Sequence, residues 1–207
     1  MQKRKLGNGV QISAVGLGCM GLSHAFGVPL EKSEAAKKIQ AAYDIGYTFF
    51  DTAECYTGTN PDGTTAYNEE AVGIGIKPFR DKIVLATKCG VIHSYSGLKM
   101  DSRPETIRRS IEGSLKRLDT DYVDLYYQHR IDPNVEPETV AETMAQLIRE
   151  GKIRAWGISC ADEEYLRRAH AVCPVTAVQN VYSMIDRDTE KLFPVFEELG
   201  ITLVAYT

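Results

Sequence analysis

The sequence has no long apolar run, no long run of lysine and arginine, and no pair of cysteines in a C-x-x-C motif. No segment approaches the roughly 20 apolar residues that a membrane-spanning helix requires. The formal net charge is -4, so charge gives no reason to expect nucleic acid or an anionic membrane as a partner. We therefore expect neither partner.

Disulfides and a structural zinc site are not expected either. The 207 residues contain five cysteines, which is an odd number in a chain of ordinary domain size. The basic residues near the start are followed by no apolar segment of the kind that a secretory signal contains. These features predict reduced thiols and a cytoplasmic location.

The sequence does contain a regular alternation of strand-like and helical segments. A hairpin is predicted at residues 3–12, with its turn at Gly7-Asn8-Gly9. Further strands are expected at 14–18, 47–51, 82–88, 122–129, 153–159, 175–179 and 201–206. Helices are expected at 32–45, 68–75, 102–118, 137–150, 162–171 and 188–199. In the third of these, Ser102 is expected as the N-cap and Glu105 as its capping-box partner.

Strands separated by single helices form βαβ units, which place the strands in a parallel sheet. Seven strands fit a doubly wound open sheet, or a (β/α)8 TIM barrel in which seven of eight strands are present. No G-x-G-x-x-G fingerprint follows the first strand, which argues against a Rossmann site. We therefore predict an α/β fold: one barrel domain over residues 1–207, preceded by the hairpin. The eighth βα unit is expected beyond Thr207.

Polar side chains end six of the predicted strands. The carboxyl ends of barrel strands meet at one rim, where such enzymes place their active sites. A single histidine at a strand end is more often structural, but six polar strand ends together are hard to explain as solvated termini. These ends are Asp51, Lys88, Gln128-His129, Ser159, Gln179-Asn180 and Tyr206-Thr207.

Four of the residues at this rim have complementary chemistry. Lys88 and Asp51 end neighbouring strands and are expected to pair, which offsets the cost of burying either charge. Tyr56 lies five residues after Asp51, and the Lys88 ammonium is expected to lower the pKa of its phenol from about 10. His129 can donate a hydrogen bond to a substrate oxygen. Together these groups would protonate an alkoxide as it forms from a carbonyl, and a cofactor must supply the hydride.

The segments that carry these residues resemble the consecutive signatures of the aldo-keto reductases, in order along the whole chain. They lie at residues 50–56, 85–88, 124–132, 157–159, 178–179 and 203–206. The resemblance implies an oxidoreductase that reduces a small-molecule aldehyde or ketone with NADPH, which leaves as NADP+. It implies that Tyr56 is the proton donor, that Asp51 and Lys88 tune it, and that His129 orients the carbonyl.

The same resemblance implies a set of cofactor contacts. Ser159 and Gln179 would bind the nicotinamide amide, and Tyr206 would stack on the ring. Gly18 and Met20 lie in a segment that resembles the family's first cofactor-contacting loop. The family's contacts to the cofactor phosphate lie largely beyond the seventh strand, so a preference for NADP is implied by the resemblance alone.

The loop at residues 24–27 resembles the long-loop, bacterial and plant-like branch of the family. Within it Phe26, together with Tyr56 and His129, is expected to contact a substrate of some apolar or aromatic character. One departure follows Ser159, where the family often has asparagine and this sequence has Cys160.

Two other functions fit parts of the pattern. Some members of this family, such as the potassium-channel β subunits, keep the fold and cofactor but act mainly as regulatory partners. The presence of all four residues Asp51, Tyr56, Lys88 and His129, here called the tetrad, favours catalysis. A metal-dependent barrel hydrolase also places His and Asp at strand ends, but it needs several histidine ligands around one metal. Here His24, His93 and His170 do not end predicted strands.

Four cysteines, Cys19, Cys55, Cys89 and Cys160, fall at or just past predicted strand ends. One hypothesis is that the charge of Lys88 favours a thiolate at Cys89, which directly follows it in the sequence, so that alkylation of these thiols inactivates the enzyme and bound NADPH protects it. The simpler alternative is that small, weakly polar side chains fill the rim.

Overall fold

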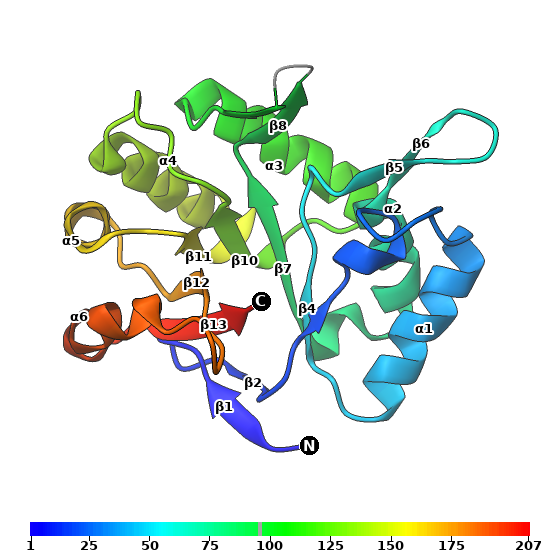
Figure 1. Cartoon of the computed structure of the whole chain (residues 1–207), viewed down its shortest axis with the longest axis horizontal. Coiled ribbons are helices and arrows are strands. Elements are labelled where there is room, and N and C mark those ends of the chain that lie inside the picture. Colours follow the sequence, from blue (N-terminus) through cyan, green and yellow to red (C-terminus); the bar gives the residue numbers. More distant parts are fainter. Residues whose placement is uncertain (95–96) are drawn as a thin grey trace.

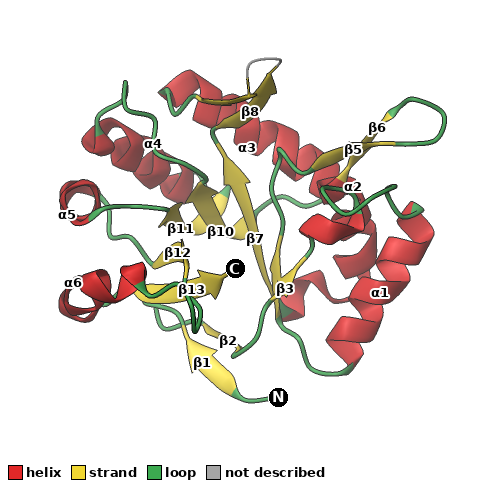
Figure 2. Ribbon diagram, in the orientation of Figure 1, coloured by secondary structure: helices red, strands yellow, loops and turns green. Residues whose placement is uncertain are grey.

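The computed structural model describes residues 1–94 and 97–207, and its main feature is a curled parallel sheet of seven strands. Helices cover the outer side of this sheet (Figures 1 and 2). The strands are β3 (Leu17–Gly18), β4 (Phe49–Asp51), β7 (Val84–Cys89), β10 (Val123–Gln128), β11 (Ile153–Ser159), β12 (Ala177–Val181) and β13 (Thr202–Tyr206). Each pairs in parallel with its neighbours, in the order β13-β12-β11-β10-β7-β4-β3.

This strand order distinguishes the predicted barrel from a doubly wound open sheet, which seven strands would also fit. A doubly wound sheet reverses its strand order at a switch point, whereas here the strands follow one another in chain order across the whole sheet. A parallel sheet that grows in one direction and curls is the arrangement of a (β/α)8 barrel. The predicted barrel fold, with seven of its strands present, is therefore confirmed.

The helices lie close to their predicted positions. They are α1 (Lys32–Asp44), α2 (Asn68–Ile76), α3 (Pro104–Leu118), α4 (Pro137–Arg149), α5 (Glu163–Val172) and α6 (Phe193–Leu199), with short 3-10 helices η1 (Met20–Leu22), η2 (Lys77–Lys82) and η3 (Asp188–Leu192). In the part of the chain that the structure describes, no helix is both long and apolar enough to span a bilayer.

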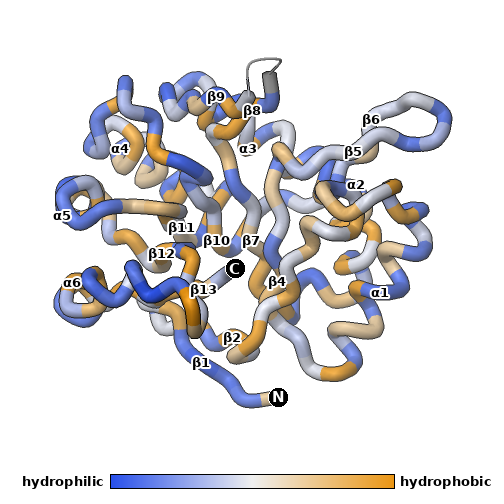
Figure 3. Tube along the Cα trace, in the orientation of Figure 1, coloured by the Kyte–Doolittle hydropathy of each residue, from blue (hydrophilic) through white to orange (hydrophobic). Residues whose placement is uncertain are grey.

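Within the described part of the chain, three hairpins accompany the barrel. The first, β1 (Lys3–Lys5) with β2 (Gln11–Ser13), is antiparallel and confirms the predicted opening hairpin. Its strand β1 is fully exposed and hydrophilic (Figure 3). The other two were not predicted from the sequence: β5 (Thr57–Thr59) with β6 (Thr65–Tyr67), and β8 (Val91–Ser94) with β9 (Gly97–Met100). Both follow the carboxyl ends of barrel strands, so they extend the rim that holds the predicted site.

Three local predictions were wrong. The strand at 14–18 shortens to Leu17–Gly18, and the helix at 188–199 divides into η3 and α6. The N-cap of α3 is Arg103, without a side-chain cap, instead of Ser102. The Ser102 backbone N–H donates to Asp132 and its hydroxyl accepts from Gln128, so tertiary partners replace the expected capping box.

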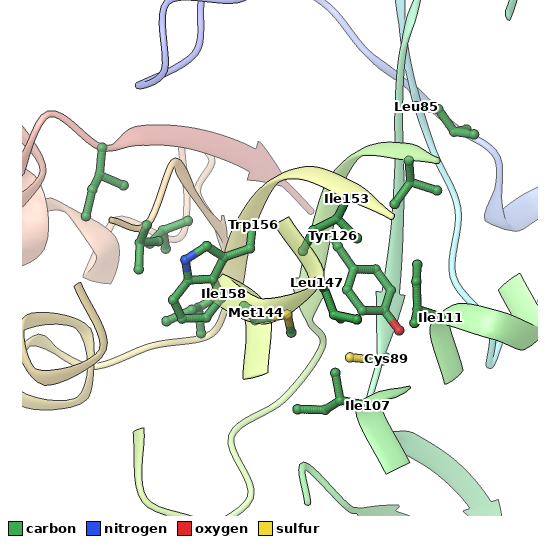
Figure 4. Packing of buried hydrophobic residues seen from close by; sticks show 14 of the residues in the cluster. Leu85, Cys89, Ile107, Ile111, Tyr126, Met144, Leu147, Ile153, Trp156 and Ile158 are labelled. Atoms are coloured by element: carbon green, nitrogen blue, oxygen red, sulfur yellow. The ribbon is translucent and has the colours of Figure 1, made fainter. Parts of the chain in front are cut away.

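The core divides between the two faces of the curled sheet. In β10, Tyr126 packs in the outer cluster beneath the helices, whereas Tyr127 belongs to the inner cluster of the barrel. Figure 4 shows the outer cluster, which includes Trp156 of β11 together with Met144 and Leu147 of α4. Successive strand residues point to opposite faces, so both faces are buried and the polar residues are left for the strand ends.

Candidate active site

Most of the predicted site residues line one cavity of about 990 Å³ at the carboxyl ends of the strands. Asp51 is the last residue of β4, and Lys88 lies one residue before the end of β7. His129 directly follows β10, and Tyr56 directly precedes β5. Parallel strands in register bring these positions to the same rim, so residues far apart in the sequence, such as Tyr56 and His129, become neighbours.

Lys88 is the centre of the arrangement. Its side chain is fully buried and its ammonium donates to the Asp51 carboxylate, to the Thr52 carbonyl oxygen at 2.8 Å and to the Tyr56 phenol oxygen at 3.2 Å. Burial works to lower the pKa of Lys88, but the charge of Asp51 and the contact with Tyr56 outweigh it, and the pKa is raised. Lys88 therefore stays charged, and the expected pair with Asp51 is present.

Tyr56 behaves differently from the sequence-based expectation. Burial raises the pKa of its phenol above the usual value, and this effect is larger than the opposing influence of the Lys88 charge. The prediction of a lowered pKa is therefore wrong for the net direction, although Lys88 does act in the predicted sense. The phenol is protonated at neutral pH, which is the form that a proton donor needs.

His129 is buried and electrically neutral. Burial, followed by the charges of Lys88, Arg130 and His93, lowers its pKa to about 2. The ring lies edge-on to the Tyr56 ring, with centroids 5.7 Å apart. A neutral imidazole has one N–H donor and one acceptor nitrogen, so His129 can donate a single hydrogen bond into the cavity.

The predicted cofactor contacts fall into two groups. Gly18, Met20, Gln179 and Tyr206 line the cavity. Gln179 also donates from Nε2 to Asp51 Oδ2 at 3.0 Å, which joins β12 to the tetrad. Ser159 does not line the cavity: it is buried, and its hydroxyl accepts from Arg130 at 3.0 Å.

The position after Ser159 has an unusual backbone. Cys160 has a φ of +61°, a left-handed conformation that asparagine adopts more readily than cysteine does. Its backbone N–H donates to Asn180 Oδ1 at 2.9 Å, and its thiol lies 3.5 Å from the Tyr206 hydroxyl. Cys160 is thus an exposed thiol beside a residue that lines the cavity.

Two histidines that were not predicted as site residues, His24 and His93, line the cavity. His24 stacks on Tyr56 with ring centroids 5.7 Å apart, and its Nδ1 donates to the Thr57 carbonyl oxygen. His93 lies in β8, with its ring 5.4 Å from that of His24. Neither ends a barrel strand, so the strand-end pattern did not identify them. Phe26, which was predicted, lines the same cavity and is 77% exposed.

Asn68 is a further residue that the sequence did not single out. Its fully buried side-chain amide donates to the Cys19 carbonyl oxygen at 2.9 Å and to the Ser23 hydroxyl at 2.8 Å, and it accepts from the Thr52 hydroxyl at 2.7 Å. Its backbone N–H donates to the Tyr56 carbonyl oxygen at 3.0 Å. One amide therefore joins the loop around η1 to Thr52, the residue after β4 whose carbonyl oxygen accepts from Lys88.

The thiols of Cys19, Cys55 and Cys89 are buried. Burial raises the pKa of Cys89 despite the neighbouring Lys88, so the expected thiolate is wrong. Burial also raises the pKa values of Cys19 and Cys55 to about 12. Within residues 1–94 and 97–207, no group of three or more His, Cys, Asp or Glu side chains is arranged to hold a metal ion.

This chain resembles known proteins in both sequence and fold. A soybean protein, probable aldo-keto reductase 1, is 42% identical over 211 residues, an alignment that covers 100% of this chain and 59% of the relative. The holo form of a Bacillus halodurans aldo-keto reductase superposes with a TM-score of 0.85 at 30% identity, covering 99% of this chain and 65% of that protein.

A Klebsiella pneumoniae aldo/keto reductase, solved in complex with NADP and acetate, gives a TM-score of 0.79 at 30% identity. The alignment covers 99% of this chain and 67% of that protein. This chain thus spans about three fifths of the curated relative and about two thirds of these two solved structures. The model of the aldo/keto reductase family matches residues 14–207, and the chain belongs to that family.

Proposed function

We propose that this chain reduces an aldehyde or ketone to an alcohol, with NADPH as the source of hydride and Tyr56 as the proton donor. The observation that carries the proposal is the convergence of Asp51, Tyr56 and His129 on one cavity, with the buried Lys88 ammonium paired to Asp51 and 3.2 Å from the phenol oxygen. The NADP complex of the Klebsiella relative supports the choice of cofactor.

The residues around the cavity fit a nicotinamide cofactor. A volume of about 990 Å³ lies at the upper end of the roughly 300–1,000 Å³ common for small-molecule sites. A side chain at Gly18 would meet no atom within 4 Å, so the backbone there borders open space. Gln179 and Tyr206 would hold the nicotinamide amide and ring, with Met20 as a further contact, whereas the buried Ser159 is not placed to reach the cofactor. When bound, the reduced nicotinamide supplies the hydride.

The protein's own groups would handle the proton. Tyr56 holds it on Oη, because burial keeps the phenol protonated at neutral pH. Lys88 stabilises the phenolate that remains after transfer, and Asp51 keeps the ammonium in place. His129, neutral in its buried position, would donate a hydrogen bond to the carbonyl oxygen and so orient it. Phe26 lies at an exposed part of the cavity, where it would contact an apolar part of the substrate.

The test is Tyr56→Phe, assayed by NADPH oxidation against a panel of aldehydes and ketones. The variant should lose roughly 10²- to 10⁴-fold in kcat, the usual contribution of a general acid. Its affinity for NADPH, measured by fluorescence titration, should stay close to that of the wild type. Wild-type turnover in the variant would refute the assignment of the donor. Tight NADPH binding with no turnover in either protein would instead indicate a cofactor-binding regulatory subunit.

A further inference from the structure

We propose that the Cys55 thiol is a positioning residue that fixes the tautomer of His129, holding the ring hydrogen on Nε2. The motivating contact is a distance of 3.4 Å between Cys55 Sγ and His129 Nδ1, with both residues buried. The catalytic consequence rests on the proposed reduction of a carbonyl, whereas the tautomer itself is a property of the free protein.

The position of Cys55 is well determined by its backbone. Its carbonyl oxygen accepts from His93 Nε2 at 3.1 Å and from the Thr57 backbone N–H at 2.9 Å. These donors come from β8 and β5, the two hairpin strands that the sequence did not predict. The thiol is therefore held against His129 by contacts that do not involve the tetrad.

The direction of the hydrogen bond follows from the acceptor strengths of the two neutral groups. Burial raises the pKa of Cys55 to about 12 and lowers that of His129 to about 2, so the pair consists of a thiol and a neutral imidazole. An imidazole nitrogen lone pair is a good acceptor, whereas a sulfur atom is a weak one. The favoured arrangement has the thiol donating to Nδ1, which leaves the ring hydrogen on Nε2.

This tautomer is the one that the proposed reaction needs. His129 lines the cavity and uses Nδ1 for Cys55, so Nε2 is the nitrogen left to meet a substrate. With a hydrogen on Nε2 the ring donates to the carbonyl oxygen. In the other tautomer Nε2 would present a lone pair to an oxygen that gains negative charge, and the contact would be repulsive.

The experiment is ¹⁵N NMR of the full chain with labelled histidine, without cofactor, at neutral pH. Protonated and unprotonated ring nitrogens differ widely in chemical shift, and the spectrum of His129→Gln assigns the His129 signals. In the wild type, Nε2 should be protonated and Nδ1 unprotonated. Cys55→Ala should shift the tautomer ratio toward Nδ1–H by roughly fivefold, which is the equilibrium effect of one modest hydrogen bond. Cys55→Ser keeps a donor and should restore the ratio.

Turnover supplies the second measurement. Cys55→Ala should lower kcat by about twofold to fivefold with little change in KM, because only the population of the competent tautomer falls. The matched control is Cys173→Ala, which removes another buried thiol, at the C-cap of α5, and should change neither measurement.

Two results would overturn the inference: an Nδ1–H tautomer in the wild type, or a Cys55→Ala variant whose His129 signals and kcat match those of the wild type. The wild-type spectrum is decisive even if the variant does not fold. A wild type that lacks turnover would refute the proposed function, while the NMR result would still decide the role of Cys55.

Discussion

Replacing His129 by glutamine is expected to change how the stability of the fold depends on pH. The pKa of His129 is about 2 in the folded chain, because of burial first and nearby positive charges second. In the unfolded chain it returns to about 6.5. As the pH falls below 6.5 the unfolded chain binds a proton that the folded chain does not bind. The wild type therefore loses stability as the pH falls from 6.5 to 2. Above pH 6.5 His129 is neutral in both states, so the stability of the fold is free of this loss.

The size of the effect follows from proton linkage. With an unfolded pKa of about 6.5, the loss is about 2 kcal/mol at pH 5 and about 0.2 kcal/mol at pH 7. The difference, about 1.9 kcal/mol, hardly depends on the folded pKa as long as that value lies well below 5. His129→Gln removes this term, so its stability should fall by about 1.9 kcal/mol less than that of the wild type between pH 7 and pH 5.

Urea unfolding of both proteins at the two pH values measures this difference. Thr143→Val is the matched control, since it removes a buried hydroxyl of α4 without removing a titratable group. Its pH dependence should follow that of the wild type. If the wild type and His129→Gln lose stability in parallel, His129 titrates normally in the fold and its assigned environment is wrong.

Two further predictions concern Lys88 and the thiols. Lys88→Met leaves the Asp51 carboxylate without its ammonium partner and should lower the free energy of unfolding at pH 7 by about 3 kcal/mol in urea titrations; a loss below about 1 kcal/mol would show that solvent already screens the pair. Under native conditions near pH 8, iodoacetamide should modify Cys160 alone, because the other four cysteines are buried. Mass spectrometry of the intact protein counts the labels on each chain. Rapid addition of more than one label would contradict the burial of the other four cysteines.

Most of the fold could be predicted from local pattern. Continuous apolar runs closed by polar residues identified the seven barrel strands, and helical spacing with a closing glycine identified helices such as α4 within a residue or two. The short hairpins at β5–β6 and β8–β9 were missed because their strands are three or four residues long and lack a clear apolar alternation. The Ser102 capping box failed because tertiary partners competed for the same backbone and side-chain groups.

The sequence by itself determined that the polar residues at the strand ends meet at one rim, since parallel strands bring their carboxyl ends together whatever the loops do, but it did not place His24 and His93 there. It therefore predicted that Asp51, Lys88, Tyr56 and His129 would lie together. Only the tertiary structure decided their protonation: the pKa of Tyr56 is raised and that of His129 falls to about 2. Desolvation dominates both shifts, and it depends on packing by residues distant in the chain, which no local sequence pattern records.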